Sequence, residues 1–409
     1  MKLVERHFIK KTHKFFPSLD AWAFASKNLY NLANYTIRQE FFKSGNPLSY
    51  PTLAKQLKET EAYRALPAKV SQQVLLTLSK SWKGFFAGKK SYKENPQKFS
   101  AKPHLPGYKN KQYGRNLLVF TTQALSQPAL RNGVVKLSKI DVQFPTKQTG
   151  VKQVRIIPRP TPRKTSYYII EVVYEKSPNK AKGLDKTVVA GIDIGLNNLA
   201  AVTSNHPCFN PFLINGRPLK AINAFYNKKR SRLQYLLPKG QYKSRQIESL
   251  TRTRNCKIDH YLHHASSFLI KTLVSKRIGT LLIGKNDGWK QGINIGKQNN
   301  QNFVSVPHSR FVHQLCYKAQ LVGIDVILTE ESYTSKCSFL DFEPIQKKEI
   351  YAGQRVSRGL FRAQNGQFIN ADINGSANII RKVIPNAFAD GIQAVVVRPI
   401  RITPCKAGI

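Results

Sequence analysis

Hydrophobic positions change their spacing along this chain, and each change predicts a different kind of structure. Residues 2–9 alternate as in a strand, and after them apolar residues recur every three to four positions, as in helices. Ser18 and Asp20 are candidate N-caps of a first helix, a second helix begins near Tyr50, and a third covers 70–86. We therefore expect a helical bundle in the first part of the chain.

Short apolar runs separated by turn residues follow this helical part. They predict strands at 116–120, 134–137, 154–157 and 167–175, and hence a small antiparallel sheet or barrel. The polar run at 177–186 is typical of a domain boundary.

Strands and helices alternate in the second half of the chain, after an opening hairpin. The predicted strands are 188–194, 199–203, 279–284 and 324–331, and the predicted helices are 217–254 (broken near Pro238 and Gly240), 265–276, one through Phe311 and Leu321, and 372–383. This alternation predicts an α/β sheet.

The charge balance points to a polyanionic partner. The chain has 66 Lys and Arg against 22 Asp and Glu, a net charge of +44, while its 41% hydrophobic content is enough to bury real cores. Such an excess of positive charge repels itself, and nucleic acid is the partner that best explains it. A ribosomal-type binder and a membrane-surface protein are the alternatives.

Two stretches concentrate the positive charge. Residues 80–115 hold ten Lys or Arg against one acid, and residues 217–254 hold eleven against one. The plain interpretation is a solvated linker and a solvated helix face, but basic residues interleaved with aromatics also suit a groove that follows a nucleic-acid backbone. The candidate phosphate contacts are Lys109, Lys111, Arg115, Lys228, Lys229, Arg230 and Arg232.

Several classes of protein are disfavoured by the sequence. The N-terminus is charged from its second residue, and no apolar run approaches the roughly 18 residues that span a bilayer. We expect no membrane partner and a cytoplasmic protein associated with a prokaryotic nucleoid. The five cysteines lie far apart, which fits neither a disulfide framework nor an evident zinc site.

Four acids can meet at one edge of the predicted sheet. Asp193 lies on the opening strand, Glu330 and Glu331 end a later strand, and Asp372 opens a helix. Grouped carboxylates repel one another unless a divalent cation lies between them, and Mg²⁺ is the natural candidate. Two such ions could stabilise the attacking and leaving oxygens of phosphodiester hydrolysis. Taken singly, Asp193 could be a turn cap and Asp372 a helix N-cap.

A family resemblance changes the weight of these interpretations. The string GIDIGLNNLA, the strand TLLIG followed by Asn286, the segment TEESYTSK and the string DINGSANIIRK resemble, in order and spacing, the RuvC-type nuclease core of the TnpB/OrfB proteins. Those proteins are transposon-encoded relatives of the compact type V CRISPR effectors. The PGYK segment (106–109) and the basic helical hairpin also fit, so the resemblance covers nearly the whole chain.

The resemblance implies an α/β fold with an RNase H-like RuvC nuclease core, an N-terminal strand-rich, β-barrel-like wedge domain and an inserted helical recognition lobe. The implied boundaries are 1–15 and 96–182 for the wedge domain, 16–95 for the helical lobe, 183–335 and 369–395 for the nuclease core, 336–368 for an insert and 396–409 for a basic tail without assigned function. We expect this tail to be poorly ordered.

The resemblance also implies an activity and partners. It predicts a Mg²⁺-dependent, RNA-guided DNA endonuclease that carries a guide RNA from the transposon end and cuts double-stranded target DNA beside a short transposon-adjacent motif. By motif position, Asp193 matches the first catalytic aspartate of the family and Asp372 the last. A guide-directed repressor without nuclease activity and, less favoured, a strand-transfer transposase are the alternatives.

Two departures from the family pattern matter. The middle acid of the family is a Glu at the end of the TLLIG strand, where this chain has Gly284, with Asp287 three residues on. We predict that the ligand has moved to Glu331, or less favourably to Glu330, on the neighbouring strand. The alternative is that both are surface acids.

The second departure is the zinc ribbon of the family. Only Cys337 remains of its first cysteine pair, and Arg362 and Asn365 stand at the second. Four ligands cannot be assembled there, so we expect no structural zinc. An apolar core of Phe339, Phe342, Leu360, Phe361 and Phe368 would replace it.

Overall fold

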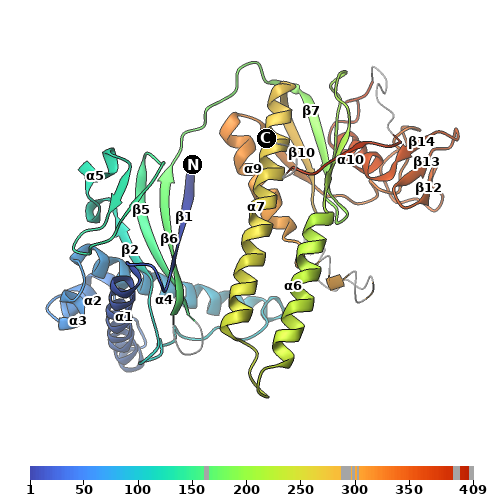
Figure 1. Ribbon diagram of the computed structural model, residues 1–409. Helices are drawn as coiled ribbons and strands as arrows, with labels where there is room; N and C mark the ends of the chain where they lie inside the picture. Colours follow the sequence, from blue (N-terminus) through green and yellow to red (C-terminus); the bar gives the residue numbers. More distant parts are fainter. Residues whose placement is uncertain (161–164, 287–295, 297–299, 302–303, 390–396, 405–409) are drawn as a thin grey trace. The chain divides into compact units, whose positions relative to one another are not determined.

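The chain folds into two compact units, Met1–Lys176 and Ser177–Ile409, each with its own core. The computed structural model describes all residues except 161–164, 287–295, 297–299, 302–303, 390–396 and 405–409 (Figure 1). Helices and sheets occur in both units, so the mixed α/β architecture predicted from the sequence is confirmed. Within the described residues, no helix is both long and apolar enough to cross a membrane.

The first unit packs helices against a twisted antiparallel sheet in the order β1-β6-β5-β2. Its helices are α1 (Phe16–Ser44), α2 (Tyr50–Leu57), α3 (Glu61–Arg64), α4 (Ala68–Glu94) and α5 (Gln127–Arg131), with short turns η1 (Pro96–Lys98) and η2 (Thr122–Ala124). Its strands are β1 (Lys2–Lys10), β2 (Leu118–Thr121), β3 (Val134–Lys136), β4 (Gln143–Pro145), β5 (Val151–Pro160) and β6 (Thr165–Glu175). β3 and β4 form a separate two-stranded sheet, and the four-stranded sheet stays open rather than closing into a barrel.

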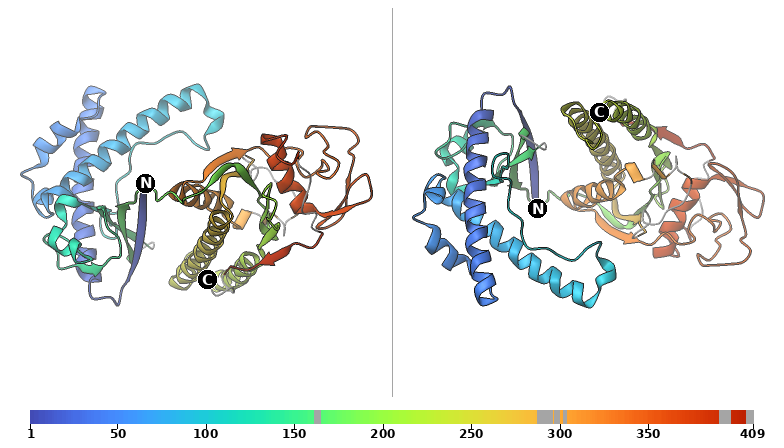
Figure 2. Two further views of the ribbon diagram at one scale, coloured as in Figure 1. Left: turned by 90° about the horizontal axis from the view of Figure 1, so that it is seen from above. Right: turned by 90° about the horizontal axis from the view of Figure 1, so that it is seen from below.

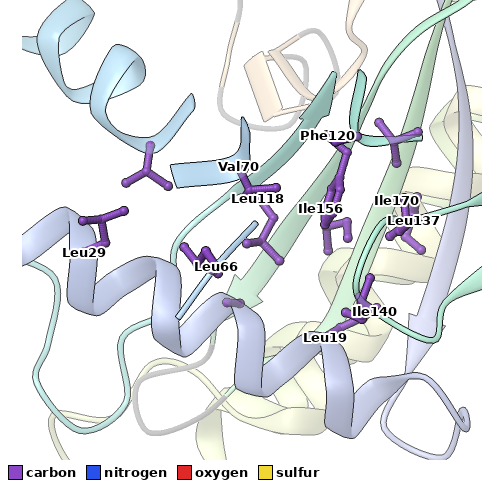
Figure 3. Close-up of a cluster of buried hydrophobic side chains, with 14 of the residues drawn as sticks. Leu19, Leu29, Leu66, Val70, Leu118, Phe120, Leu137, Ile140, Ile156 and Ile170 are labelled. Carbon is purple, nitrogen blue, oxygen red and sulfur yellow. The ribbon is translucent and has the colours of Figure 1, made fainter. Parts of the chain in front are cut away.

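The core of this unit joins the helices to the sheet (Figure 3). Leu19 and Leu29 of α1 and Val70 of α4 belong to the same buried cluster as Phe120 of β2 and Ile156 of β5. The long pairing of β1 with β6, from Lys2 opposite Glu175 to Lys10 opposite Tyr167, brings the two ends of the unit together. The opening strand therefore belongs to the sheet that follows the helices.

The start of α1 differs from the prediction. The helix begins at Phe16 with Pro17 in its first turn, and neither Ser18 nor Asp20 caps it. Asp20 lies inside the helix, and its carboxylate accepts hydrogen bonds from Arg115 (Nε to Oδ1, 3.0 Å; Nη2 to Oδ2, 2.7 Å) and from the Tyr168 hydroxyl (2.7 Å). A proline compatible with the first helical turn moved the helix start upstream of the cap signal.

The second unit is built on a six-stranded sheet in the order β11-β10-β7-β8-β9-β15. Its strands are β7 (Asp185–Asp193), β8 (Asn198–Ser204), β9 (Phe212–Asn215), β10 (Ile278–Gly284), β11 (Asp325–Thr329) and β15 (Ile400–Ile402). Its helices are α6 (Arg217–Tyr235), α7 (Arg245–Ser275), α9 (His308–Val322) and α10 (Ala371–Val383).

Side chains that alternate along the strands pack against helices on both faces of this sheet. Ala190 and Ile192 belong to the core cluster that includes α7 and α9, whereas Val189 and Leu282 pack with α10. The sheet lies between these helices (Figures 1 and 2). β7, β10 and β11 run parallel, so their carboxyl ends meet at one edge. That edge, on the α10 face, carries the candidate site.

A basic helical hairpin is formed by α6 and α7. α7 is one continuous helix from Arg245 to Ser275, so the end of the predicted stretch 217–254 and the predicted helix 265–276 are a single element. Tyr226 of α6 and Thr251 of α7 meet through their hydroxyls at 3.1 Å, and Asn223 accepts from Arg254 Nε at 2.8 Å. Pro238 and Gly240 lie in the turn between the helices, as predicted.

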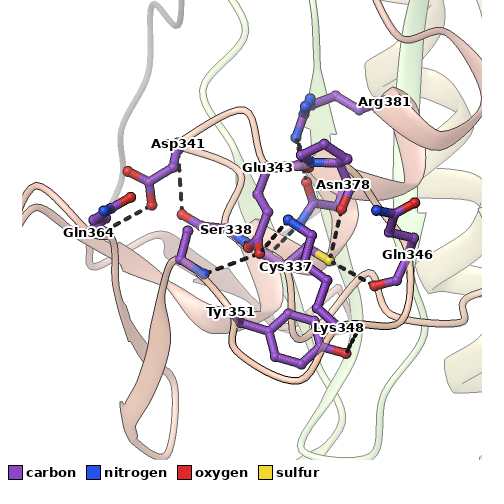
Figure 4. A network of polar contacts seen from close by, with 12 residues as sticks. Cys337, Ser338, Asp341, Glu343, Gln346, Lys348, Tyr351, Gln364, Asn378 and Arg381 are labelled. Atoms are coloured by element: carbon purple, nitrogen blue, oxygen red, sulfur yellow. Dashed lines mark hydrogen bonds and ion pairs between the residues drawn. The ribbon is translucent and has the colours of Figure 1, made fainter.

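The insert before α10 is organised around a buried carboxylate (Figure 4). Glu343 is 3% exposed, and its oxygens accept from the backbone N–H groups of Ser338 (2.7 Å) and Ala352 (3.1 Å) and from Lys348 Nζ (3.1 Å). Its strands β12 (Gln354–Ser357), β13 (Leu360–Arg362) and β14 (Phe368–Asn370) form a small antiparallel sheet. The Glu343 carboxylate therefore links a backbone segment before it in the chain to one after it.

The predicted apolar core of the insert is only partly present. Phe339 and Phe361 are buried and pack with the α10 cluster, but Phe342 and Phe368 are exposed at 45% and 40%. The guanidinium of Arg381 instead lies over the ring of Phe342, with 5.2 Å between Arg381 Cζ and the ring centroid.

The C-terminal tail also differs from the prediction. Residues Ile400–Ile402 form strand β15, which pairs in parallel with β9 from Ile400 opposite Phe212 to Ile402 opposite Ile214. Ile400 and Ile402 alternate as in a strand, although the composition of the tail is basic. Residues Ile400–Ile402 of the tail therefore belong to the sheet.

Removing the Glu343 carboxylate should loosen the insert. In Glu343→Ala, two backbone N–H groups and Lys348 lose a charged acceptor, a local loss of about 3 kcal/mol. Amide hydrogen exchange across 337–353 should accelerate about 100-fold, because 1.4 kcal/mol corresponds to tenfold. Exposed Glu349 provides the matched control, Glu349→Ala, with unchanged exchange. Unchanged exchange in Glu343→Ala, or one zinc per chain by elemental analysis, would contradict this organisation.

Candidate active site

Three parallel strands end side by side at the acidic edge. Ile192 of β7 pairs with Ile283 of β10, and Gly284 of β10 pairs with Thr329 of β11. This register puts Asp193 beside Gly284, and Glu331 two residues beyond the end of β11. β11 ends at Thr329, so the two glutamates lie in the following turn rather than on the strand.

Asp193 faces α10 and uses the space left by a glycine of that helix. A Cβ on Gly375 would lie 2.7 Å from Asp193 Oδ2, which is closer than real Cβ contacts allow. The strand and the helix N-terminal turns can therefore approach closely only because position 375 has no side chain. This packing places the N-terminal part of α10 directly against the Asp193 carboxylate.

Glu331 occupies the space that a side chain at position 284 would take. A Cβ on Gly284 would lie 2.5 Å from both Cγ and Oε1 of Glu331 and 2.6 Å from Cδ1 of Ile379. Asn286 holds the residue in place, accepting from the Glu331 backbone N–H at 3.0 Å and facing Oε2 with its amide nitrogen at 3.4 Å. Glu331 Oε1 is buried and has no hydrogen-bond partner among the described residues.

Asp372 is held at the start of α10 by neutral side chains. Asn370 caps the helix, accepting from the backbone N–H groups of Asp372 (3.1 Å) and Ile373 (3.3 Å). Asn198, the first residue of β8, donates from Nδ2 to Asp372 Oδ2 at 2.6 Å. The other oxygen, Oδ1, lies 3.7 Å from Nη2 of Arg355 on β12.

The electrostatics of the site are those of crowded carboxylates. Burial, and then the negative charges of Glu331 and Asp372, raise the pKa of Asp193 well above its usual range, and Arg355 opposes the shift. Burial raises the pKa of Glu331 to about 7. The positive charge of Arg355 does not offset the shift of Asp193, and a further cation among these acids would favour the charged form of both carboxylates.

The donor set fits a divalent cation with oxygen ligands. Asp193, Glu331 and Asp372 supply only carboxylates, and the unpartnered Oε1 of Glu331 leaves a buried acceptor available. The described residues do not contain three or more His, Cys, Asp or Glu side chains already gathered closely enough to enclose a metal ion. Glu331 and Asp372 act electrostatically on Asp193 without forming a closed cage with it, and Mg²⁺ is an ion that usually keeps several waters.

The predicted acids separate into two groups. Glu331 and Asp372 lie close enough to Asp193 to raise its pKa, whereas Glu330 is exposed. Asp287 lies outside the described residues. Adjacent glutamates in a turn point in different directions, and only the close fit to Gly284 distinguishes Glu331.

Sequence analysis assigned no role to three polar neighbours of the acids. Asn198 and Asn286 lay within the motifs that carried the resemblance, so their position was a usable signal. Arg355 lay in the insert, 17 residues before Asp372 in a segment without motif, and nothing in its surroundings marked it.

The predicted basic residues of the first unit are held against α1. Side chains of α1 bind the backbone of the PGYK region: Asn31 Nδ2 donates to the Lys109 carbonyl (2.8 Å) and accepts from its N–H (2.9 Å), and Asn34 and Arg38 donate to the Pro106 carbonyl. The segment has no regular secondary structure, but its path is fixed by this ladder of bonds. Lys111 is exposed, Lys109 lies over the ring of Tyr30, and Arg115 is engaged by Asp20.

The predicted basic residues of the second unit lie on the exposed side of α6. Lys228, Lys229, Arg230 and Arg232 are all exposed. Large apolar side chains near the hairpin turn are exposed too, with Tyr235 at 89% and Tyr242 at 73%. Exposed rings among cations suit contacts with nucleic-acid bases.

Comparison with known proteins gives related matches across the chain. A family model described as OrfB_IS605, probable transposase, matches residues 170–290, and one described as Cas12f1-like, TNB domain, matches residues 308–379. The chain is 25% identical over 396 residues to the TnpB-like protein ORF457 of Acidianus two-tailed virus, covering 88% of this chain and 82% of that protein.

Two CRISPR-associated proteins are also similar. The CRISPR-associated endodeoxyribonuclease Cas12f2 of Micrarchaeota archaeon is 27% identical over 234 residues, covering 54% of this chain and 41% of that protein. A solved Cas12f1–sgRNA–target DNA complex contains a chain of similar fold, with a TM-score of 0.55 and 12% identity over 89% of this chain and 82% of that chain.

The raised pKa of Glu331 predicts a pH-dependent stability. The folded protein binds a proton on the Glu331 carboxyl more tightly than the unfolded chain does. The contribution of this group to the free energy of unfolding is therefore full below about pH 4.5 and is lost as the pH rises through about 7. In the metal-free protein, Glu331→Gln should therefore raise the melting temperature at pH 8 and change it little at pH 5.

Its neighbour supplies the matched control. Glu330 is exposed, so Glu330→Gln should leave the melting temperature unchanged at both pH values. An equal effect of Glu331→Gln at pH 5 and pH 8 would show that burial of its charge is not the cause.

Proposed function

Because this chain belongs to the TnpB/OrfB family, we propose that it is an RNA-guided endonuclease of a transposable element, which hydrolyses the backbone of double-stranded DNA beside a short transposon-adjacent motif. The RNase H-like α/β core, the strand-rich unit and the inserted helices agree with the fold of the Cas12f1 chain. The wedge, helical lobe, nuclease core and insert boundaries predicted from the sequence are part of this proposal.

The observation that carries the proposal is the position of Glu331. The family acid is absent at Gly284, yet a Glu from the adjoining turn enters the space that this glycine leaves. Its charge raises the pKa of Asp193, as does that of Asp372, so the three carboxylates form one electrostatic group. A chain released from catalysis would have no need for this costly arrangement.

Asp193, Glu331 and Asp372 are the residues that would hold Mg²⁺, as a pair of ions in our proposal. When bound, the metal supplies charge stabilisation for the attacking and leaving oxygens of phosphodiester hydrolysis. Asn286 and Asn198 orient two of the carboxylates, and Asn370 fixes the helix turn that carries Asp372. Arg355 lowers the repulsion among the acids and presents a cation to a phosphate at the same edge.

Two partners follow from the same proposal, a guide RNA from the transposon end and the target DNA. The solved Cas12f1 relative is a complex with sgRNA and target DNA. In this chain the support is the net charge of +44, the exposed cations of α6 and the immobilised PGYK region with exposed Lys111. Fixing that backbone in advance lowers the entropy cost of binding a phosphate backbone.

Cleavage assays with single variants test the assignment. With guide RNA, Mg²⁺ and a plasmid target, Asp193→Ala, Asp372→Ala and Glu331→Gln should each lower the cleavage rate by at least about 100-fold, because each removes a ligand charge. Target binding should persist, since no phosphate-facing cation is lost. Glu330→Gln is the matched control and should cut normally; a normal rate in Glu331→Gln would refute the relocation.

Moving the glutamate from position 331 to position 284 tests the relocation by a gain of cleavage. Gly284→Glu alone should fail, because its side chain meets Glu331 and Ile379. Gly284→Glu combined with Glu331→Ala and Ile379→Val clears that space and should recover cutting relative to Glu331→Ala alone. If the unmodified protein retains target DNA without cutting it, while the swapped protein cuts, the guide-directed repressor is the correct reading.

The α6 surface has its own test. Replacing Lys228, Lys229 and Arg230 together by Gln should reduce the salt dependence of nucleic-acid binding, with the log–log slope falling by up to about three. The change should be the same for every target sequence, because phosphate contacts carry no sequence information. An unchanged slope would identify this face as an ordinary solvated one.

A further inference from the structure

The C-terminal strand reaches the acidic site through one neutral side chain. Arg401 of β15 donates from Nε to Oδ1 of Asn198 at 3.0 Å, and Asn198 donates from Nδ2 to Oδ2 of Asp372 at 2.6 Å. We propose that Arg401 is a positioning residue for the acidic site, which orients Asp372 through the carboxamide of Asn198. This inference rests on the proposed function, in which Asp372 binds metal.

The position of Arg401 on β15 places its side chain on the α10 face of the sheet. Its strand partner Leu213 packs in the cluster of α10, whereas Ile402 and its partner Ile214 pack in the cluster of α7 and α9. Alternation along β15 therefore sends Arg401 toward the α10 face, where Asp372 lies. The strand is secured beyond this point by a 3.0 Å hydrogen bond from Asn215 to Thr403.

The donor and acceptor types fix the orientation of the amide. An arginine only donates hydrogen bonds and an ionised carboxylate only accepts them, so Asn198 must turn its oxygen to Arg401 and its nitrogen to Asp372. Both ends of the carboxamide are thereby specified, and rotation of the side chain would break two bonds. No carboxylate among the described residues forms an ion pair with Arg401, so charge pairing does not explain its placement.

The consequence is a defined direction for the Asp372 carboxylate. Oδ2 is held by Asn198, which leaves Oδ1 on the side of Arg355. Bonds that orient a metal ligand typically change metal affinity or activity by about 10- to 100-fold when removed. The tail would then act on the site without touching substrate or metal.

A purely structural role for Arg401 makes a different prediction, and a double-mutant cycle separates the two. If Arg401 acts through Asn198, its removal matters only while Asn198 is present. If it only anchors β15, its removal costs the same with or without Asn198.

The experiment measures Mn²⁺ binding to the full-length protein by titration calorimetry. Arg401→Met should weaken Mn²⁺ binding about tenfold, Arg401→Lys should recover part of this loss by restoring a donor, and Arg401→Met should change affinity less than about twofold in an Asn198→Ala background. Arg398→Met removes the same charge from the same tail and should bind as the unmodified protein does.

Each outcome decides a separate point. Unchanged affinity in Arg401→Met, or an equal tenfold loss in the Asn198→Ala background, overturns the positioning role and leaves the proposed function standing. Absence of Mn²⁺ binding by the unmodified protein overturns the metal site, and this inference with it.

Discussion

The close approach of α10 to the strand ends is the constraint on which the site depends. Two glycines permit it: Gly375 leaves room for the Asp193 carboxylate, and Gly284 leaves room for Glu331 and Ile379. A side chain at either position would move the helix off the sheet and separate the acids. The same packing withdraws the carboxylates from water, which raises the pKa of Asp193 and of Glu331. The grouping of the acids and its electrostatic cost therefore have one physical origin.

Residues distant in sequence offset the electrostatic cost of grouping these acids. Arg355 reaches the site from the insert, Asn286 from the turn after β10 and Asn198 from the start of β8. The insert itself is stable enough to present Arg355 because Glu343 gathers its backbone N–H groups and Lys348. A buried carboxylate thus does in this segment what tetrahedral thiolate ligation does in a zinc ribbon: it joins separated backbone segments through one centre.

Much of the architecture could be predicted from periodicity, because long helices and buried strands repeat a clear pattern. The strand β10, the helix at 372–383 and the turn in the basic hairpin follow directly from the spacing of apolar residues and from Pro238 and Gly240. The start of α1 could not be predicted in this way, since Asp20 is a good cap in isolation and is used instead by Arg115 and Tyr168 across the fold. Strand β15 was missed because a three-residue edge strand depends on its partner β9 more than on its own composition.

The site shows the same division between local and tertiary information. Motif position marked Asp193 and Asp372 as candidate ligands, and Gly284, where the family has a Glu, is the basis for predicting a ligand elsewhere. The sequence already favoured Glu331 over Glu330, and the structure supplies a physical reason, because neighbouring residues in this segment enter different spaces. Glu331 and Ile379 together fill the space that a side chain at position 284 would occupy. A glutamate at 284 and the observed Glu331 would therefore compete for the same space, so in our proposal the loss of the side chain at 284 accompanies the relocation of the ligand to Glu331.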